Sequence, residues 1–296
     1  TCRRNDENDL IVAASSATAT RLAQGVFPGN TMDQVRWIGS VGADYGVIAV
    51  AEDSGINIFA GSPVKEIKQT EDNQLIVVYD DDGEDKYLIA DKVLMAVGRQ
   101  PDYGGLDVEG LGLELDENDR GIKVDAHLET SIPGIYAIGD VTDMVQLAHV
   151  ASHQGVVAVK NIVGEECEMD YSAVPSAIFT DPEMATVGLD EESAREQGLD
   201  IEIGRFPFSA NGKVLTHGET DGFIKLIKNK ENDRVLGAAI TGVHATDLIA
   251  ELTLAVENDM TAEQLIETIH AHPTTAEVVH EAALATTEDG PLHYLK

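Results

Sequence analysis

The stretch Thr130-Ser131-Ile132-Pro133-Gly134-Ile135-Tyr136-Ala137-Ile138-Gly139-Asp140, with Leu147-Ala148-His149-Val150-Ala151 shortly after it, decides the fold of this chain. The apolar run 134–138 predicts a buried strand, and the glycine turn that follows presents the carboxylate of Asp140. A helix is predicted from about Leu147 to Ile162, with Gly164 as its stop. The first turn of this helix is then expected to face the same place as the carboxylate.

This arrangement brings together two groups that suit a ligand. The Asp140 carboxylate can accept hydrogen bonds from the hydroxyls of a polyol. A helix N-terminus offers free N–H groups and partial positive charge to an electron-rich ring edge. On spacing alone, an ordinary strand, turn and helix with a solvated aspartate explains the same residues, so other parts of the sequence must decide.

The composition narrows the class of protein. The chain has 296 residues, with 20 Lys+Arg against 53 Asp+Glu and a formal net charge of −33. Its length indicates two domains of roughly 100–200 residues each. The 43% of hydrophobic residues is enough for a core and argues against disorder. The negative charge argues against binding to nucleic acid or to anionic membranes. A high-salt cytoplasm would favour such an acidic surface.

The cysteines and the N-terminus bear on the compartment. Cys2 and Cys167 form no metal-binding pattern and no disulfide framework, so a reducing cytoplasm is expected. No apolar run approaches the roughly 18 residues of a membrane span, and the N-terminal residues do not resemble a secretory signal. The first residue is Thr1, which hints at a processed chain or a fragment.

Short apolar runs separated by turns predict the remaining elements. The strands expected before residue 100 lie at 56–59, 64–67, 75–79 and 93–97, the last one a buried parallel strand. In the C-terminal part, an antiparallel hairpin is expected from 223–227 and 235–240, and helices at about 246–258, 262–269 and 275–286. The C-terminal part is therefore expected to be an α+β unit.

A second chemical motif is His270-Ala271-His272-Pro273-Thr274-Thr275-Ala276-Glu277. Thr274 and Glu277 have the spacing of a capping box that opens a helix, which would leave His272 as a plain loop residue. The chemical interpretation pairs the His272 imidazole with the Glu277 carboxylate, which would orient it and stabilise its charged form. Such a pair can take a proton from a thiol and pass the thiolate to a disulfide.

These stretches resemble the pyridine-nucleotide disulfide oxidoreductases, over about residues 55–290. Four further segments carry the resemblance: Val93–Pro101, Val174–Gly188, Phe208–Gly212 and Gly218–Phe223. Within the family, His270-Ala271 favours the dihydrolipoamide dehydrogenases over glutathione reductases. The C-terminal residues 291–296 lack the vicinal cysteine pair of mercuric reductases.

The resemblance implies FAD and NAD as cofactors and assigns roles to residues. His272 would be the acid/base and Glu277 would hold it, while Asp140 would bind the ribityl chain of FAD. The remaining residues at the flavin would be Gly139, Gln146, Leu147, Ala148 and His149, and Val64 and Gly98 would line the NAD site. The implied activity is the oxidation of dihydrolipoamide to lipoamide.

The resemblance also implies partners, domains and a fold class, namely α/β nucleotide-binding domains, Rossmann-like and partial, followed by an α+β dimerisation domain. A homodimer would form through residues 173–296, and the lipoyl domain of a 2-oxoacid dehydrogenase complex or of the glycine cleavage system is a further expected partner. We expect four segments: the end of an FAD domain (1–34), a partial NAD-binding domain (35–100), a second FAD-binding segment (101–172) and the dimerisation domain (173–296).

The sequence departs from the family at two places. It contains neither the first Gly-x-Gly-x-x-Gly loop nor a Cys-x4-Cys pair, and the glycines of 37–46 are misplaced for a dinucleotide loop. Residues 9–16 and 27–30 faintly resemble the end of the first flavin segment. A fragment or truncated enzyme is therefore favoured. The alternatives are an inactive dimerisation module, a subunit complemented by another chain, or a related flavin disulfide reductase of the mercuric or glutathione type.

Overall fold

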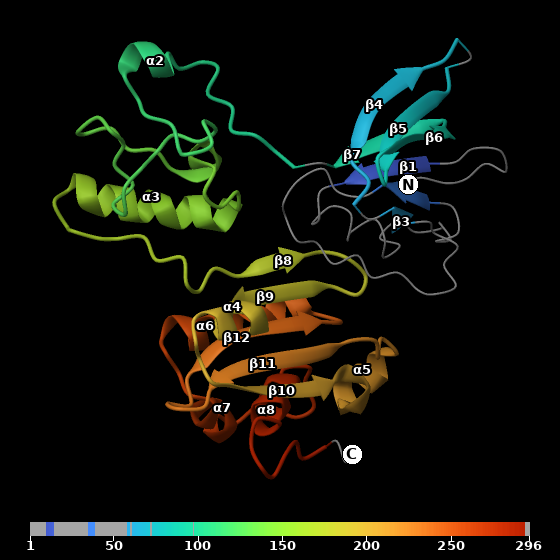
Figure 1. The fold of residues 1–296 in the computed structure, drawn as a ribbon. Helices are drawn as coiled ribbons and strands as arrows, with labels where there is room; N and C mark the ends of the chain where they lie inside the picture. Colours follow the sequence, from blue (N-terminus) through green and yellow to red (C-terminus); the bar gives the residue numbers. More distant parts are fainter. Residues whose placement is uncertain are drawn as a thin grey trace. The chain divides into compact units, whose positions relative to one another are not determined.

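The computed structural model describes residues 10–14, 35–38, 58–59, 61–71, 73–96 and 98–293. The chain divides into two compact units, Arg99–Val174 and the remainder (Figure 1). The remainder comprises an N-terminal part that ends at Gly98 and a C-terminal part that begins at Pro175. Each part is described by itself.

A four-stranded parallel sheet lies in the N-terminal part, with the strand order β3-β2-β1-β7. Its strands are β1 (Leu10–Ala14), β2 (Val35–Ile38), β3 (Ile58–Phe59) and β7 (Lys92–Ala96). The chain steps outward from β1 to β3 and returns on the other side of β1, which is the winding of half a Rossmann fold. The expected α/β class is confirmed, and the strand expected at 93–97 is parallel, although Leu94 is 37% exposed.

The pairing of β1 bears on the expected segments. We expected residues 1–34 to end an FAD domain, and the structure pairs Val12 of β1 with both Trp37 of β2 and Leu94 of β7. One sheet therefore contains strands from two of the expected segments. The segment boundaries stay predictions, and most of 1–57, including the 39–46 loop, lies outside the described residues.

An antiparallel meander follows β3, formed by β4 (Val64–Gln69), β5 (Leu75–Asp81) and β6 (Glu84–Ala90). Alternate residues of β5 are buried, so Val77 and Tyr79 form its core with Ala90. The tight turn between β5 and β6 is stabilised by Asp80, whose Oδ1 accepts the N–H of Gly83 at 2.8 Å. The strands expected at 64–67 and 75–79 are confirmed.

The unit 99–174 contains one long helix, α3 (Ala148–Ile162), and one short helix, α2 (Val108–Leu111). The helix expected at 147–162 is confirmed. It buries residues three or four positions apart, namely Val150, Gln154, Val157 and Ala158.

The strand expected at 134–138 is wrong. Gly134 has φ +83°, and the N–H of Ile135 bonds back to the carbonyl oxygen of Ile132, so the segment begins in a turn and too few residues remain to form a strand. It makes a single bridge, between Glu129 and Tyr136. Ile138 is 40% exposed, and the chain then enters a short 3-10 helix, Gly139–Thr142.

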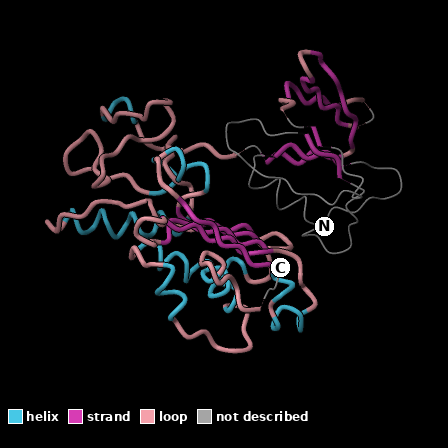
Figure 2. The backbone as a smooth tube through the Cα atoms, turned by 60° about the horizontal axis from the view of Figure 1, so that its bottom comes forward, coloured by secondary structure: helices cyan, strands magenta, loops and turns pink. Residues whose placement is uncertain are grey.

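The C-terminal part is a five-stranded antiparallel sheet with helices packed on it, which confirms the α+β expectation (Figure 2). The strand order is β10-β11-β12-β9-β8. The strands are β8 (Ser176–Ile178), β9 (Met184–Gly188), β10 (Ile201–Pro207), β11 (Phe223–Asn229) and β12 (Val235–Thr241). The hairpin expected from 223–227 and 235–240 is confirmed as β11 and β12.

Five helices accompany this sheet: α4 (Glu191–Glu196), α5 (Gly212–His217), α6 (Ala245–Glu257), α7 (Ala262–Glu267) and α8 (Glu277–Leu284). Helix α6 packs on β9 and β12, and α8 packs on β10 and β11. The core between them contains Phe206, Ile224 and Val278, each at most 1% exposed. Packing of this kind fixes α8 and therefore the loop that precedes it. Among the described residues, no helix combines the length and apolar character needed to cross a bilayer.

Candidate active site

The loop between α7 and α8 contains the predicted acid/base motif. Helix α7 begins at a complete capping box, in which Thr261 and Gln264 each bond the other's main chain, so the entry to this region is fixed. The structure brings His272 and Glu277 together: Nδ1 of His272 lies 2.8 Å from Oε1 of Glu277. The His272 side chain is 74% exposed, whereas that of Glu277 is only 20% exposed.

This contact sets the tautomer of neutral His272. A carboxylate oxygen can only accept, so the hydrogen lies on Nδ1 and Nε2 keeps a lone pair. The other oxygen of Glu277, Oε2, accepts the main-chain N–H of Thr274 at 2.8 Å. Both carboxylate oxygens are therefore bonded, which fixes the carboxylate and hence the direction of the imidazole.

The environment of Glu277 also determines its charge. Burial alone would raise the pKa of the Glu277 carboxyl. The hydrogen bonds from the Thr274 N–H and from His272 outweigh burial, and His293 adds a favourable charge interaction, so the pKa lies below the usual value of 4.5. Glu277 is consequently ionised throughout the neutral range and can stabilise an imidazolium at His272.

The capping box expected at Thr274 and Glu277 is only half formed. The Glu277 carboxylate reaches the Thr274 N–H as expected, but the Thr274 hydroxyl donates to the carbonyl oxygen of Ala271 at 2.7 Å. Helix α8 begins at Glu277 itself, with Ala276 as N-cap. The threonine therefore closes the loop upon itself instead of capping the helix.

Asn211 is a positioning residue that the sequence reasoning missed. Its side chain is buried, and its Nδ2 donates to the carbonyl oxygen of Thr274 at 3.1 Å while its Oδ1 accepts the N–H of Val214 at 2.9 Å. It thereby ties the 268–276 loop to the start of α5. The signal was present, because Asn211 lies in the segment Phe208–Gly212 that carried the resemblance.

A hollow of about 240 Å³ lies beside the His272–Glu277 pair and is lined by Glu277 and by several other ionisable side chains. One of them is Glu281, whose side chain is 3% exposed and whose Oε1 lies 2.5 Å from Nδ1 of His293. The main-chain N–H of His293 donates to the other oxygen at 3.2 Å. These bonds join the C-terminal segment to α8 close to the acid/base pair.

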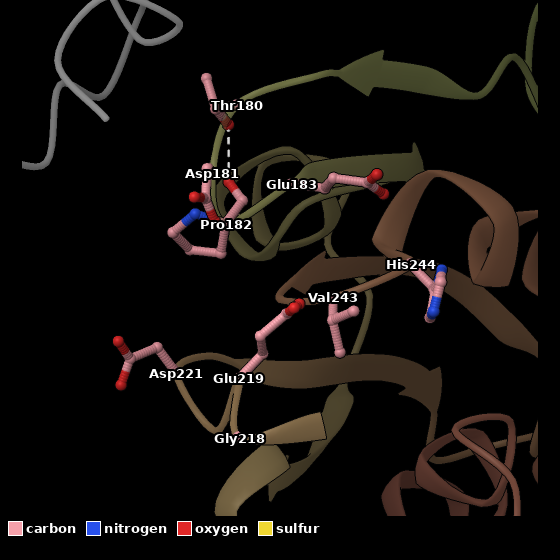
Figure 3. Close-up of a pocket in the computed structure, with 9 residues that line it drawn as sticks. All are labelled: Thr180, Asp181, Pro182, Glu183, Gly218, Glu219, Asp221, Val243 and His244. Carbon is pink, nitrogen blue, oxygen red and sulfur yellow. Dashed lines mark hydrogen bonds between the residues drawn. The ribbon is translucent and has the colours of Figure 1, made fainter. Parts of the chain in front are cut away.

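A larger hollow of about 580 Å³ lies elsewhere in the C-terminal part and contains neither His272 nor Glu277. Figure 3 shows the segment 180–183 on one side of it and 218–221 on the other, with Val243 and His244 completing the rim. Its acidic side chains include Glu183, which accepts from the N–H and hydroxyl of Thr246 at the start of α6. Among the described residues, no group of three or more His, Cys, Asp or Glu side chains could hold a metal ion.

The predicted flavin residues gather at the junction of the 3-10 helix and α3. Gly139 has φ +75°, and a Cβ there would lie 3.1 Å from Cβ of Ala151, so glycine permits the close approach to α3. Its N–H donates to Oε1 of the buried Gln154 at 2.6 Å. Gln154 was not predicted as a site residue, although it fixes the turn that presents Asp140.

Arg99 joins two of the predicted residues and was itself missed as a site residue. Its Nη2 lies 2.6 Å from Oδ2 of Asp140 and donates to the carbonyl oxygen of Gln146 at 3.1 Å. The Gln146 side chain in turn donates to Asp143 at 2.7 Å. Arg99 lies in the segment Val93–Pro101 that carried the resemblance. The sequence therefore indicated that this segment matters, but not that Arg99 contacts Asp140.

The start of α3 has the features expected of a ligand-facing helix end. Its N-cap, Leu147, provides no side-chain cap, and the first turn, which includes Ala148 and His149, contains no acidic residue. The positive end of the helix dipole is therefore not neutralised by a carboxylate of its own first turn. Asp140 is 46% exposed and can accept further hydrogen bonds.

The two predicted NAD residues lie in the N-terminal part. Val64 is the first residue of β4 and packs against the core of the meander, beside Phe59 and Val93 among others. Gly98 has φ +102°, a conformation that side chains other than glycine rarely adopt.

Comparison with known protein families gives two matches. The profile described as "Pyridine nucleotide-disulphide oxidoreductase" matches residues 43–155. The profile described as "Pyridine nucleotide-disulphide oxidoreductase, dimerisation domain" matches residues 174–283, which span the five-stranded sheet and reach into α8. Together they cover most of the chain.

Similar proteins include two named dihydrolipoyl dehydrogenase. The protein from Bacillus subtilis is 45% identical over 242 residues, which cover 81% of this chain and 51% of the relative. The protein from Halobacterium salinarum is 43% identical over 233 residues, which cover 79% of this chain and 49% of the relative. The chain thus spans about half the length of these relatives.

A solved structure shows a similar fold. The crystal structure of LpdA from Mycobacterium tuberculosis superposes with a TM-score of 0.81 at 25% identity, over 93% of this chain and 61% of that one.

Proposed function

The chain belongs to the pyridine nucleotide-disulphide oxidoreductase family, and from this premise we propose that it forms part of a dihydrolipoyl dehydrogenase. The proposed reaction is the oxidation of dihydrolipoamide to lipoamide with NAD as the final acceptor. The observation that carries the proposal is the bond between Nδ1 of His272 and Oε1 of Glu277 at 2.8 Å. It gives an exposed imidazole with a basic Nε2 and an ionised partner.

In the proposed reaction His272 acts as the acid/base. Its Nε2 accepts the proton of a substrate thiol, and the ionised Glu277 stabilises the imidazolium that forms. The thiolate attacks a disulfide, so one S–S bond forms as another breaks and one thiolate leaves. The second substrate thiol then attacks the first substrate sulfur in the mixed disulfide and displaces the cysteine bound to it, passing its proton to that cysteine. This closes the lipoamide disulfide and leaves the cysteine pair as one thiol and one thiolate. Two electrons have passed from dihydrolipoamide to the cysteine pair, and His272 holds a proton to return.

The redox disulfide itself must be supplied by residues other than those of this chain. Cys2 and Cys167 are its two cysteines, and they are 165 positions apart in the sequence. Cys167 lies in the acidic segment 165–171, far in sequence from the other cysteine. This chain would contribute the acid/base pair, not the disulfide.

The residues of the 99–174 unit fit the second half of an FAD site. Asp140 presents a half-exposed carboxylate that can accept from the ribityl hydroxyls, and Arg99 and Gln154 fix the segment around it. The start of α3 offers a dipole without a carboxylate in its first turn to the electron-rich edge of the ring. When bound, FAD would supply electron transfer between the dithiol and NAD.

The further assignments follow from the family. Gly139 would allow the turn that presents Asp140, Gln146 to His149 would lie at the flavin, and Val64 and Gly98 would line the NAD site. A homodimer would form through residues 173–296, the part that the dimerisation profile matches. The protein would work in the cytoplasm, with the lipoyl domain of a 2-oxoacid dehydrogenase complex or of the glycine cleavage system as partner.

One observation favours a second candidate. Because this chain has no cysteine pair suited to the redox disulfide, it is also consistent with a dimerisation module that does not itself catalyse. That candidate predicts a stable dimer that binds no flavin, whereas the first predicts flavin binding by the complete protein.

The visible absorption spectrum tests the proposal. The complete protein that contains this chain is purified, mixed with FAD, passed through gel filtration, and examined for a flavin band that stays with the protein. Oxidation of dihydrolipoamide is then followed by the reduction of NAD. Retained flavin with substrate-dependent NAD reduction supports the first candidate. A flavin-free dimer without turnover supports the second.

A further inference from the structure

His270 differs from its neighbours in the 268–274 loop. The structure describes the whole segment between Thr268 and Thr274. All of its residues except His270 are exposed, and Ile269 is 96% exposed. The His270 side chain is 8% exposed. It is therefore the one side chain of this segment that turns inward, two residues before the exposed His272.

Both ring nitrogens of His270 are bonded, and both face acceptors. Nδ1 lies 2.9 Å from the carbonyl oxygen of Thr268, and Nε2 lies 2.9 Å from Oε1 of Glu251 on α6. A carbonyl oxygen and a carboxylate oxygen can only accept, so both nitrogens must carry hydrogen for both bonds to form. The hydrogen on Nε2 then bonds the ring to the Glu251 carboxylate.

The contacts of His270 reach three helices of the C-terminal part. The ring lies 5.6 Å, centre to centre, from that of His280 on α8, and Nε2 of His280 is bonded to the carbonyl oxygen of Ile266 at 3.2 Å. Glu251 comes from α6, which packs on β9 and β12. His270 therefore connects the loop to a helix fixed by the central sheet, in addition to its neighbours on α7 and α8.

We infer that His270, held by Glu251, is a positioning residue for the His272–Glu277 pair. On the C-terminal side of His272 the loop is fixed at Thr274. Its carbonyl oxygen accepts from Asn211, and its N–H donates to Glu277. His270 fixes the loop on the N-terminal side, so that the direction of Nε2 of His272 is determined from both sides. This inference rests on the proposed role of His272 as acid/base.

Loss of Glu251 should release the anchor. Without it the Nε2–H of a ring that is 8% exposed would lose its acceptor, which is costly. The ring would then either move its hydrogen away from Nε2 or turn toward solvent. In both cases the 268–273 segment gains freedom and the Nδ1 hydrogen of His272 spends less time on Glu277.

Nuclear magnetic resonance of the 296-residue chain with ¹⁵N-labelled histidine tests this directly. Long-range correlations between ring carbon-bound hydrogens and ring nitrogens report which nitrogens carry hydrogen. In the unmodified chain we expect Nε2 of His270, the nitrogen that faces Glu251, to carry hydrogen. A His270 ring with a bare Nε2 would overturn the inference, and this reading requires no variant to fold.

The variant Glu251→Ala tests the effect on His272. We expect the Nδ1 hydrogen of His272 to exchange with solvent about tenfold faster or more. Glu251→Gln should restore most of the protection, because its side-chain oxygen still accepts from Nε2 of His270. Unchanged exchange in Glu251→Ala would contradict the inference.

Asp247→Ala is the matched control. Asp247 lies one turn before Glu251 on α6 and also faces a histidine, His244. The Asp247 side chain is 87% exposed, however, and its Oδ2 lies 3.9 Å from Nδ1 of His244. This variant should leave the exchange at His272 unchanged, and a change equal to that in Glu251→Ala would overturn the inference. None of these readings depends on turnover, so a failed positioning role is distinguishable from a failed acid/base role.

Discussion

Nδ1 of His272 lies 2.8 Å from Oε1 of Glu277, which is five residues further along the chain and opens helix α8. The helix is packed into the core of the C-terminal part through Val278 and Val279, both fully buried. The carboxylate therefore occupies a fixed position, while the imidazole it orients is exposed. This geometry suits the proposed acid/base role, in which the exposed imidazole meets a substrate from outside the core of the C-terminal part.

Removal of the carboxylate should weaken catalysis less than removal of the imidazole. In a complete enzyme that contains this chain, we expect Glu277→Ala to lower the rate of dihydrolipoamide oxidation by about 10- to 100-fold, because the base remains but its orientation and charge partner are lost. Steady-state kinetics of NAD reduction measure the effect. A rate equal to that of the unmodified enzyme would refute the orienting role of Glu277.

Replacement of Asp140 should reduce flavin binding. Asp140→Ala removes the carboxylate expected to accept from the ribityl hydroxyls and also releases Arg99. We expect a lower ratio of flavin to protein after gel filtration of the complete enzyme. Glu117→Ala, at an exposed carboxylate of the same unit, is the control and should retain flavin. Equal flavin content in both variants would exclude a role for Asp140.

The stability of the C-terminal part should depend on pH through Glu191. Its side chain contacts Lys225, Arg205 and Arg195 at 3.0, 3.1 and 3.2 Å. The hydrogen bond from Lys225 is the largest influence on the pKa of Glu191, and with the two arginines it outweighs burial, so the pKa lies below its usual 4.5.

A carboxyl pKa that is lowered by folding makes the folded state less stable as the pH falls. The unfolded chain binds the proton first, so the stabilisation from Glu191 is complete above its unfolded pKa and is lost as the pH falls through the folded one. We expect the loss of unfolding free energy between about pH 6 and about pH 3 to be smaller in Glu191→Gln than in the unmodified chain. Denaturant unfolding at both pH values measures this difference. Identical losses would show that the contacts add nothing in solution.

The chain should be a dimer in solution. The dimerisation profile matches residues 174–283, and exposed apolar side chains such as Phe179, Leu254 and Ile269 lie within that range. Analytical ultracentrifugation at micromolar concentration should give twice the chain mass. A monomer under these conditions would exclude assembly through residues 173–296.

Much of the C-terminal fold could be predicted from the sequence, because its elements follow local rules. The alternating apolar residues of β11 and β12 and the apolar spacing of α6 specify their own elements. The segment 134–138 could not be predicted in this way. Its run of apolar residues has the composition of a strand, but the turn at Gly134 and the bond from Ile135 to Ile132 are set by the loop around it.

The candidate site shows the same division. His272 and Glu277 could be paired from the sequence, because five residues across a helix start bring them within reach. Arg99 could not be joined to Asp140, since 41 positions separate them and nothing local relates them. The same holds for Asn211 and Thr274, and for Glu251 and His270, which are 63 and 19 residues apart and meet through packing.

The measurement that tests the central claim most directly compares two reactions of His272→Gln in a complete enzyme. Dihydrolipoamide oxidation needs the acid/base, whereas transfer from NADH to an artificial electron acceptor bypasses the thiol step. We predict that the first falls by about a hundredfold or more while the second stays near that of the unmodified enzyme. His244→Gln, at a half-exposed histidine of the same part, should leave both rates unchanged. Near-normal dihydrolipoamide oxidation by His272→Gln would contradict the account.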